Sequence, residues 1–434
     1  MKSRFLIGAL SSGGGKTTLT MGILRALSDR GLQVQPFKCG PDYIDTRFHE
    51  AATGRASVNL DTWLSSKEHV KELYGRYGAD ADVCVIEGVM GLYDGYDRSA
   101  GSSAEIAQLT STPVLLVAGA RSTSYTLAAQ LWGLKHFRPG LQFAGVVFNQ
   151  VGSARHERLL LQAAEDAGLP CLGTLPRLPE LEIPSRHLGL QLADDDQMRQ
   201  HTALAAEMVE RYVDLSALLL TSRAKSTFPL AQAATPMKDD RPLRIAVARD
   251  AAFNFTYREN LSRLAQAGQL VFFSPLAGDA LPEADLVYFP GGYPELYARE
   301  LSAQDALKRQ IREYAEDGGR ILAECGGMIW LSQAIEGVEG GPYAMCGVLP
   351  FSATMEGAKL HMGYRRLTDE AGREWKGHEF HYSSLTAPDA LPSIAIQYNA
   401  AGELVPKPLY RYKNVIAGYT HLYWGESDIL YLWN

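Results

Sequence analysis

The sequence predicts an α/β protein with two domains, each built around a mostly parallel sheet. Short apolar runs alternate with helical patterns along the chain, and this alternation is typical of parallel sheets covered by helices. The length of 434 residues is nearly three times the ~150 residues expected of one domain. A stretch at 221–241 is rich in Ser, Thr, Ala, Pro and charge and has no periodicity. We interpret it as a linker between domains 1–220 and 242–434.

The composition excludes several classes of protein. Hydrophobic residues make up 46% and charged residues 21% of the chain, so it can bury a sizeable core. The formal net charge is -7, which argues against general electrostatic binding to nucleic acid. No apolar run approaches the ~20 residues that span a bilayer, and the five scattered cysteines form no C-x-x-C pair. We therefore expect a cytoplasmic protein with reduced thiols, no membrane partner and no nucleic-acid partner.

Apolar runs predict the strands in order. In the first domain the predicted strands are residues 5–10, 34–37, 83–86, 114–118 and 143–148. Between the first two, Leu19, Ile23 and Leu27 recur every four residues, which predicts a helix that ends near Gly31. In the second domain the predicted strands are residues 244–248, 270–273, 286–289 and 320–323.

A glycine-rich loop connects the first predicted strand to this helix, with the sequence Leu-Ser-Ser-Gly-Gly-Gly-Lys-Thr-Thr at 10–18. Its glycines let backbone N–H groups point at phosphate oxygens, Lys16 adds a positive charge, and the Thr17 hydroxyl suits Mg²⁺. The strict G-x-x-x-x-G-K-[ST] pattern is not met, because Leu10 occupies its first glycine position. The strand before and the helix after the loop still favour phosphate binding over a glycine turn with a solvated lysine. The predicted ATP-binding residues of the loop are Gly13, Gly14, Gly15, Lys16, Thr17 and Thr18.

Glu87 follows the predicted strand 83–86 and opens a glycine-punctuated loop. A carboxylate at the C-terminal end of a parallel strand faces the ligand crevice, where it can meet the magnesium of a phosphate loop. We therefore expect Glu87 to join Thr17 at a metal, with a merely solvated acid as the alternative.

The second predicted domain carries a candidate nucleophile at Cys325. The surrounding pattern predicts a strand, a sharp turn and a helix, so we expect the turn to expose the sulfur at a helix N-terminus and lower its pKa. A buried structural cysteine is the alternative. Gly291 and Gly292, together with Gly326, offer backbone N–H groups to an oxyanion. His421 offers an imidazole as general base and then general acid.

These two sets of residues resemble two known families. The loop, with serines in its middle, resembles that of dethiobiotin synthetases, which use ATP to activate carboxylates, although Ala9 stands where that group often has glycine. The cysteine, oxyanion glycines and histidine resemble those of class I glutamine amidotransferases, which release ammonia from glutamine through a thioester. Many of these carry a carboxylate two residues after the histidine, where this chain has Tyr423; the subgroup of cobalamin biosynthesis commonly lacks it. The resemblance implies a P-loop NTPase-type domain followed by a class I glutamine amidotransferase-like α/β domain.

Further segments are similar to those of the cobyrinic acid a,c-diamide synthase family, and they span essentially the whole chain. They are residues 38–45 with 59–61, 87–95, 148–156, 184–190 and 377–383. The resemblance implies a ligase that amidates the a- and c-acetate carboxylates of cobyrinic acid or a related tetrapyrrole, with ATP, Mg²⁺ and L-glutamine. The implied roles are a metal near Thr17, Asp45 and Glu87, carboxylate activation at Asp42, Tyr43 and Asp94, and purine contact at Asn149.

Several alternatives stay open. The spacing of Asp42 and Asp45 fits one shared metal or water, or the capping of a helix. His378 and His381 flank Glu379, and we expect an active-site wall or tetrapyrrole contact there rather than a metal site. Rival functions are nickel-sirohydrochlorin a,c-diamide synthase, cobyric acid synthase and a nucleotide-dependent partitioning or regulatory module. The sequence leaves open whether the chain forms a homodimer.

Overall fold

The computed structural model describes residues 2–177, 195–223 and 242–433. The chain divides into two compact units, Met1–Ala233 and Ala234–Asn434. The expected linker, 221–241, lies outside the described residues apart from its first three, and its bounds stay a prediction. The segment 184–190 also lies outside them.

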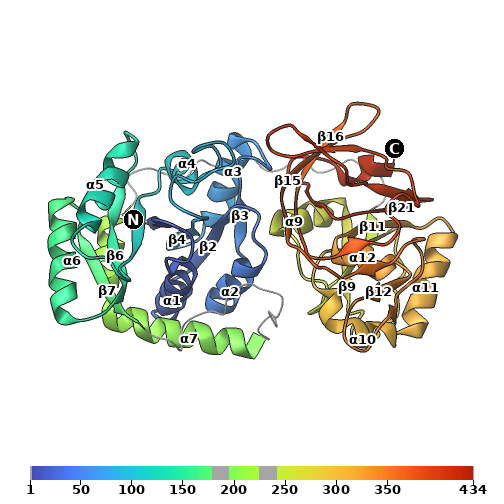
Figure 1. The fold of residues 1–434 in the computed structure, drawn as a ribbon, viewed down its shortest axis with the longest axis horizontal. Coiled ribbons are helices and arrows are strands. Elements are labelled where there is room, and N and C mark those ends of the chain that lie inside the picture. The colour runs from blue at the N-terminus through green and yellow to red at the C-terminus, as the bar shows by residue number, and fades with distance from the viewer. Residues whose placement is uncertain (1, 178–194, 224–241, 434) are drawn as a thin grey trace. The chain divides into compact units, whose positions relative to one another are not determined.

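A seven-stranded parallel sheet, in the order β3-β2-β4-β1-β5-β6-β7, forms the centre of unit 1 (Figure 1). Its strands are β1 Ser3–Ala9, β2 Val34–Cys39, β3 Val58–Leu60, β4 Val83–Glu87, β5 Val114–Gly119, β6 Phe143–Val151 and β7 Cys171–Pro176. All five predicted strands of this half are present. β3 and β7 were not predicted, because β3 has only three residues and β7 is interrupted by Gly173 and Thr174.

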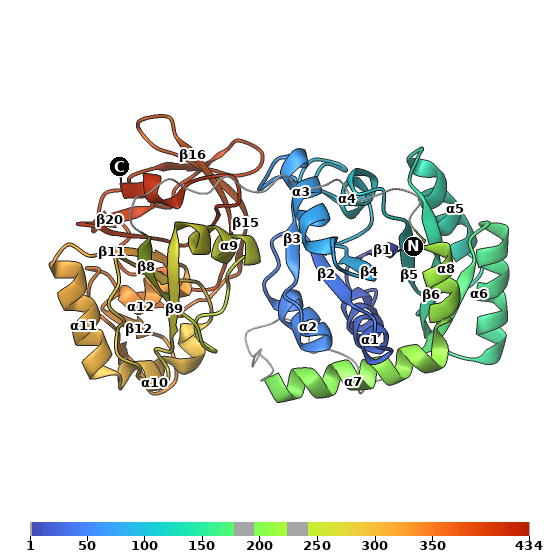
Figure 2. The same ribbon diagram turned by 180° about the vertical axis from the view of Figure 1, so that it is seen from behind.

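Helices cover both faces of this sheet, as Figure 2 shows from the opposite side. They are α1 Lys16–Asp29, α2 Ile44–Thr53, α3 Lys67–Gly78, α4 Ser103–Leu109, α5 Leu127–Phe137, α6 Ala154–Asp166, α7 Asp195–Tyr212 and α8 Leu215–Thr221. Side chains of α1, α2, α7 and α8 share one apolar cluster, whereas those of α3 to α6 share the cluster on the other face. The unit is therefore a three-layer α/β fold.

Helix α1 confirms the predicted stripe, since Leu19, Ile23 and Leu27 are fully buried and Gly31 follows the helix with a φ of 81°. The unpredicted α7 packs against it (Figure 1). A Cβ at Gly22 would come within 2.4 Å of the Ala205 carbonyl oxygen, so glycine is what lets these two helices pack closely.

Unit 2 is built on a six-stranded sheet in the order β20-β21-β11-β10-β8-β9, in which all neighbours except β20 and β21 are parallel. These strands are β8 Leu243–Ala248, β9 Gly268–Phe273, β10 Leu286–Phe289, β11 Arg320–Glu324, β20 Tyr410–Tyr412 and β21 Val415–Gly418. The helical segments are α9 Arg258–Ala267, η2 Pro294–Tyr297, α10 Ala298–Ser302, α11 Asp305–Glu316, α12 Gly326–Leu331 and η3 Ile429–Trp433. All four predicted strands of this half are confirmed.

Two further sheets in unit 2 were not predicted. One is five-stranded and antiparallel: β15 His361–Thr368, β16 Glu374–His381, β18 Ile396–Tyr398, β19 Leu404–Val405 and β22 His421–Tyr423. The other is small: β12 Ala334–Glu336, β13 Tyr343–Ala344, β14 Ala353–Thr354 and β17 Ser384–Leu385. Leu367, Trp375 and Leu422 of the five-stranded sheet share a cluster with Ile245 and Leu322 of the six-stranded one.

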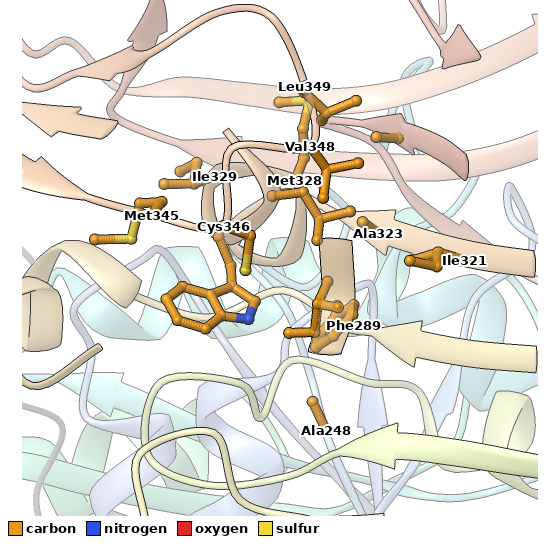
Figure 3. Packing of buried hydrophobic residues seen from close by; sticks show 14 of the residues in the cluster. Ala248, Phe289, Ile321, Ala323, Met328, Ile329, Met345, Cys346, Val348 and Leu349 are labelled. Carbon is orange, nitrogen blue, oxygen red and sulfur yellow. The ribbon is translucent and has the colours of Figure 1, made fainter. Parts of the chain in front are cut away.

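A second apolar cluster of unit 2 surrounds the start of α12 (Figure 3). Met328 and Ile329 of this helix pack with Phe289 of β10 and Ile321 of β11. Cys346 is fully buried in the same cluster and has a structural role. This packing fixes the turn between β11 and α12, which carries Cys325.

Candidate active sites

The phosphate loop lies between β1 and α1 at the C-terminal edge of the first sheet. Gly13 and Gly15 have φ values of 74° and 93°, a region that favours glycine. No side chain caps the first turn of α1, so its backbone N–H groups are available to an anion. Thr17 and Thr18 lie in that turn, next to Lys16. The local geometry is therefore that of an anion site.

Lys16 reaches from α1 to the loop that follows β4. Its Nζ donates to the carbonyl oxygen of Met90 at 2.6 Å. Burial, and then the neighbouring charge of Lys38, lower the pKa of Lys16, whereas Glu87, Asp45 and Asp94 raise it. Two cations and three carboxylates are thus close enough to influence one another beside the loop.

Glu87 ends β4 and is almost fully buried. Its Oε1 accepts a hydrogen bond from Thr17 Oγ1 at 2.7 Å, and its Oε2 lies 2.7 Å from His49 Nε2. Lys38 Nζ is 3.7 Å from Oε1. Burial alone would raise the pKa of Glu87, but Lys38, His49 and Thr17 outweigh it and bring the pKa to about 2. Glu87 is therefore a buried anion.

Lys38 and His49 belong to the same cluster of charges and were not predicted from the sequence. Lys38 Nζ lies 3.3 Å from Asp45 Oδ2 and donates to the Gly88 carbonyl oxygen at 3.0 Å. Burial opposes its charge, yet Glu87, Asp45 and Asp42 raise the pKa of Lys38 above its usual value. One signal was available, since a lysine at the end of a buried strand needs an anion nearby. The paired register of Lys38 with Glu87 supplies that anion.

Asp42 and Asp94 make local hydrogen bonds that order the loops. Asp42 Oδ1 accepts from the backbone N–H groups of Ile44 and Asp45, both at 2.9 Å, so the capping alternative describes this atom. Asp94 Oδ2 accepts from the Gly91 N–H at 2.9 Å. Tyr43 is buried at the start of α2.

Asn149, near the end of β6, contacts the phosphate loop from beneath. Its Nδ2 donates to the Gly14 carbonyl oxygen at 3.2 Å, and a Cβ at Gly15 would approach this Nδ2 to 2.1 Å. The purine contact expected of Asn149 stays a prediction.

Cys325 lies between β11 and α12 with φ 46° and ψ -104°. This is a strained backbone for a residue other than glycine, costing roughly 1–3 kcal/mol. The expectation of an exposed sulfur with a lowered pKa is wrong. The side chain is buried, and burial, followed by the charge of Glu295, raises the pKa of the Cys325 thiol. Its Sγ lies 3.8 Å from the Phe380 carbonyl oxygen. Cys325 is therefore a neutral thiol in this structure.

His421 begins β22 and is also buried. Burial lowers its pKa to about 3, and a hydrogen bond to the backbone of Phe255 acts in the opposite direction. The imidazole is therefore neutral at physiological pH. A neutral imidazole can accept a proton, which a general base requires.

The three expected oxyanion glycines lie together beside His421. A Cβ at Gly291 would come within 2.0 Å of His421 Cε1, and one at Gly326 within 2.9 Å of the Gly292 nitrogen. Any larger residue at Gly291 would push the imidazole away. The structure thus brings Cys325, both glycine segments and the histidine into one site.

Glu324, next to Cys325, is a further residue that the sequence analysis missed. Its Oε1 accepts from the Leu422 N–H at 3.0 Å and its Oε2 lies 2.7 Å from the Tyr288 hydroxyl oxygen. Burial raises the pKa of Glu324 to about 8. This side chain connects β11, which leads to Cys325, with β22, which carries His421. Tyr423, two residues after His421, packs edge to face on Tyr257, with the ring centroids 5.3 Å apart.

The segment around Glu379 forms a polar wall of the same unit. Glu379 is fully buried and its Oε2 lies 2.9 Å from an Arg365 nitrogen. His381 stacks on Tyr419 at 3.6 Å, and its Nε2 lies 2.7 Å from Lys407 Nζ.

Among the described residues no group of three or more His, Cys, Asp or Glu is arranged to hold a metal. Nor is any described helix both long and apolar enough for a membrane span.

Comparisons with known proteins agree with the division of the chain into two units. Residues 5–190 match the family model of the CobQ/CobB/MinD/ParA nucleotide binding domain, and residues 244–429 match that of the CobB/CobQ-like glutamine amidotransferase domain. Proteins named cobyrinate a,c-diamide synthase from Picrophilus torridus and Listeria innocua are 40% and 38% identical. The alignments cover 97% and 99% of this chain and 96% and 98% of the relatives. A hydrogenobyrinate a,c-diamide synthase from Brucella abortus is 40% identical, over 96% of this chain and 98% of its own.

Proposed function

The chain belongs to the family of cobyrinate and hydrogenobyrinate a,c-diamide synthases, and on this premise we propose that it amidates the a- and c-acetate carboxylates of cobyrinic acid. It is a glutamine-dependent, amide-forming ligase with a nucleotide-binding domain. One observation carries the proposal. A single chain holds a charged phosphate-loop site around Glu87 and a neutral thiol–imidazole site around Cys325.

In unit 2 the proposed reaction releases ammonia. His421 takes the proton of the Cys325 thiol as the sulfur attacks the amide carbon of glutamine. Backbone N–H groups of Gly291, Gly292 and Gly326 receive the developing oxyanion. His421 then gives its proton to the leaving nitrogen, ammonia departs, and water hydrolyses the remaining thioester to glutamate.

In unit 1 the proposed reaction activates the carboxylate. A carboxylate oxygen attacks the γ-phosphorus of ATP, ADP leaves, and an acyl phosphate remains; ammonia then displaces phosphate and forms the amide. Lys16, Lys38 and the N–H groups at the start of α1 offset the negative charge of the triphosphate and the carboxylate. Asp42, Tyr43 and Asp94 order the loops around this reaction.

The oxygen atoms beside the loop fit magnesium, which is part of the proposal. Thr17 Oγ1 and Glu87 Oε1 lie 2.7 Å apart, Glu87 is ionised, and Asp45 is bridged to Glu87 through Lys38. Hydroxyl and carboxylate oxygens are the ligands that Mg²⁺ prefers. When bound, the ion would neutralise charge on the phosphates.

The decisive test incubates the purified chain with ATP, Mg²⁺, L-glutamine and cobyrinic acid and follows product mass. We expect one and then two carboxylate-to-amide conversions that require both ATP and glutamine. Lys16→Ala should lose synthesis with either glutamine or ammonium while it retains most glutamine hydrolysis. If the chain amidated nickel sirohydrochlorin but not cobyrinic acid, the substrate would be nickel sirohydrochlorin instead. ATP binding without glutamine hydrolysis would favour a regulatory module.

The expected cytoplasmic location and the possible homodimer also stay proposals. Light scattering of the purified chain would test the dimer directly, since a mass of 47.5 kDa in solution would contradict it.

A further inference from the structure

A cavity of about 830 Å³ opens in unit 1 beside the phosphate loop. The loop contributes the segment from Ser11 to Gly14, while the side chains of Lys16 and Thr17 do not line it. The cavity therefore adjoins the part of the loop that precedes α1. Its size falls within the range of cavities that bury most of a small-molecule ligand.

An aromatic and aliphatic wall forms the opposite side of the cavity. Tyr93 and Phe137 meet edge to face with ring centroids 5.0 Å apart, and Leu134 lies beside them. The Tyr93 hydroxyl donates to the Leu134 carbonyl oxygen at 2.7 Å, which satisfies one of the free carbonyls at the end of α5. This bond holds the Tyr93 ring in place, so the wall is already formed without a ligand.

The charge of the lining is one-sided. None of the described residues that line the cavity is Asp or Glu, and Arg121 is the one charged residue among them. This holds in a chain whose formal net charge is -7. Arg121 is exposed and makes no ion pair or hydrogen bond within the described part of the chain. A second guanidinium, that of Arg138, does not line the cavity but lies 5.5 Å from the centre of the Phe137 ring, where it donates to Ser99 Oγ at 2.7 Å. The cavity thus suits a ligand with both apolar surface and carboxylates.

Two glycines leave room inside the cavity. Gly119, at the end of β5, and Gly133, within α5, both line it, and a Cβ at either would meet no atom within 4 Å. The space in front of α5 is therefore not filled by the protein itself.

We propose that this cavity binds one edge of the tetrapyrrole substrate, an inference that rests on the proposed function. The ring edge lies against the wall of Tyr93, Leu134 and Phe137. A carboxylate that is not being amidated pairs with Arg121. The acetate to be activated lies at the Ser11–Gly14 side, where the γ-phosphate of ATP must come within reach. The neutral base and ribose of the nucleotide would give Arg121 no partner, so the nucleoside is the less suitable occupant.

The test uses the full-length chain and measures the KM for cobyrinic acid, the KM for ATP and the rate of glutamine hydrolysis. Gly133→Leu should fill the cavity without a backbone clash, and Gly133→Ala should fill less of it. We expect the KM for cobyrinic acid to rise about tenfold or more in Gly133→Leu, less in Gly133→Ala, and about tenfold in Arg121→Gln. The KM for ATP and glutamine hydrolysis should stay unchanged.

A matched control is Arg158→Gln, since Arg158 is an exposed arginine on α6 that does not line the cavity. Its KM for cobyrinic acid should equal that of the unaltered chain, and thermal melting should confirm that every variant folds. If Gly133→Leu and Arg121→Gln raised the KM for ATP instead, the cavity would be the nucleoside site. If neither KM changed, the inference would also be overturned. An unaltered chain that binds ATP but does not amidate cobyrinic acid would overturn the proposed function, and the inference with it.

Discussion

Glu87 and Glu324 occupy similar places in the two units and have opposite protonation states. Each ends a parallel strand, each precedes a glycine-containing loop of a site, and their exposed fractions are 1% and 2%. The pKa of Glu87 is lowered to about 2, whereas the pKa of Glu324 is raised to about 8. Burial pushes both pKa values upward, so the difference comes from the partners.

Glu87 has an ammonium group, an imidazole and a hydroxyl around it, whereas Glu324 has a tyrosine hydroxyl and a backbone N–H. Burial alone therefore does not set the charge of an active-site carboxyl group. Unit 1 keeps ions in its site, which suits phosphoryl transfer. In unit 2 the thiol of Cys325, the imidazole of His421 and the carboxyl of Glu324 are neutral, which suits proton transfer between a thiol and an imidazole.

The largest expected effect comes from removing Cys325, the proposed nucleophile. Cys325→Ala should lower glutamine-dependent synthesis more than about 10⁴-fold, because no thioester can form. Synthesis with free ammonium should persist, since the charged site is untouched. Assays with each nitrogen source check this, with Cys171→Ala, a cysteine outside both sites, as the control. Loss of both activities would show that the two chemistries are not divided between the units.

The next effect comes from removing the anion of unit 1. Glu87→Gln should lower synthesis from either nitrogen source about 10³-fold, because Lys38 loses one of its two carboxylate partners and the proposed Mg²⁺ would lose a ligand. Glutamine hydrolysis should be retained. Glu324→Gln, measured in parallel, should change synthesis little, since a neutral amide replaces a protonated carboxyl. An equally severe loss of synthesis in this variant would contradict the opposite protonation states of Glu87 and Glu324.

A smaller effect concerns how the free energy of unfolding depends on pH. Glu87, with a lowered pKa, stabilises the fold above its unfolded value of about 4.5, and this contribution is lost as pH falls toward 2. Glu324, with a raised pKa, has its most favourable contribution below about 4.5 and loses it as pH rises toward 8.

Calorimetric melting between pH 5 and 8 should therefore show that Glu324→Gln gains stability relative to the unaltered chain as pH rises. Over the same range Glu87→Gln should be less stable than the unaltered chain by a nearly constant amount. Parallel curves for the unaltered chain and Glu324→Gln would contradict the raised pKa of Glu324.

The smallest expected effect is the absence of a histidine limb in the pH profile of glutamine hydrolysis. Because the pKa of His421 is lowered to about 3 by burial, its protonation should not reduce kcat/KM between pH 5 and 7. Steady-state rates at constant ionic strength would check this. An acid limb near pH 6.5 in the kcat/KM profile of the unaltered chain would contradict a desolvated base.

Much of the fold followed from local signals. The buried strands and α1 were predicted because apolar runs and four-residue spacing lie within single segments. The antiparallel strands of unit 2 escaped prediction, since several have only two or three residues and gain their stability from partners distant in sequence. β22, which carries His421, pairs with β16 some forty residues earlier.

The sites divide in the same way. The phosphate loop and the Cys325 turn have local sequence patterns, whereas Lys38 gains its role from the register of β2 against β4 and Glu324 gains its own from β22. The pKa of Cys325 was predicted in the wrong direction, because burial depth is a tertiary property. The favourable field of the six-residue helix α12 does not overcome that burial.

The enclosure of Cys325 also bears on how this protein withstands oxidative chemistry. Peroxide and simple alkylating agents react with thiolates that they can reach, and here Cys325 is 3% exposed and its thiol holds its proton. Such reagents should modify the partly exposed Cys171 before they reach this residue. An effective inactivator would have to imitate glutamine closely enough to enter the site. Its electrophile would have to lie where the amide carbon of glutamine would lie, so that the Cys325 thiol loses its proton as the sulfur attacks.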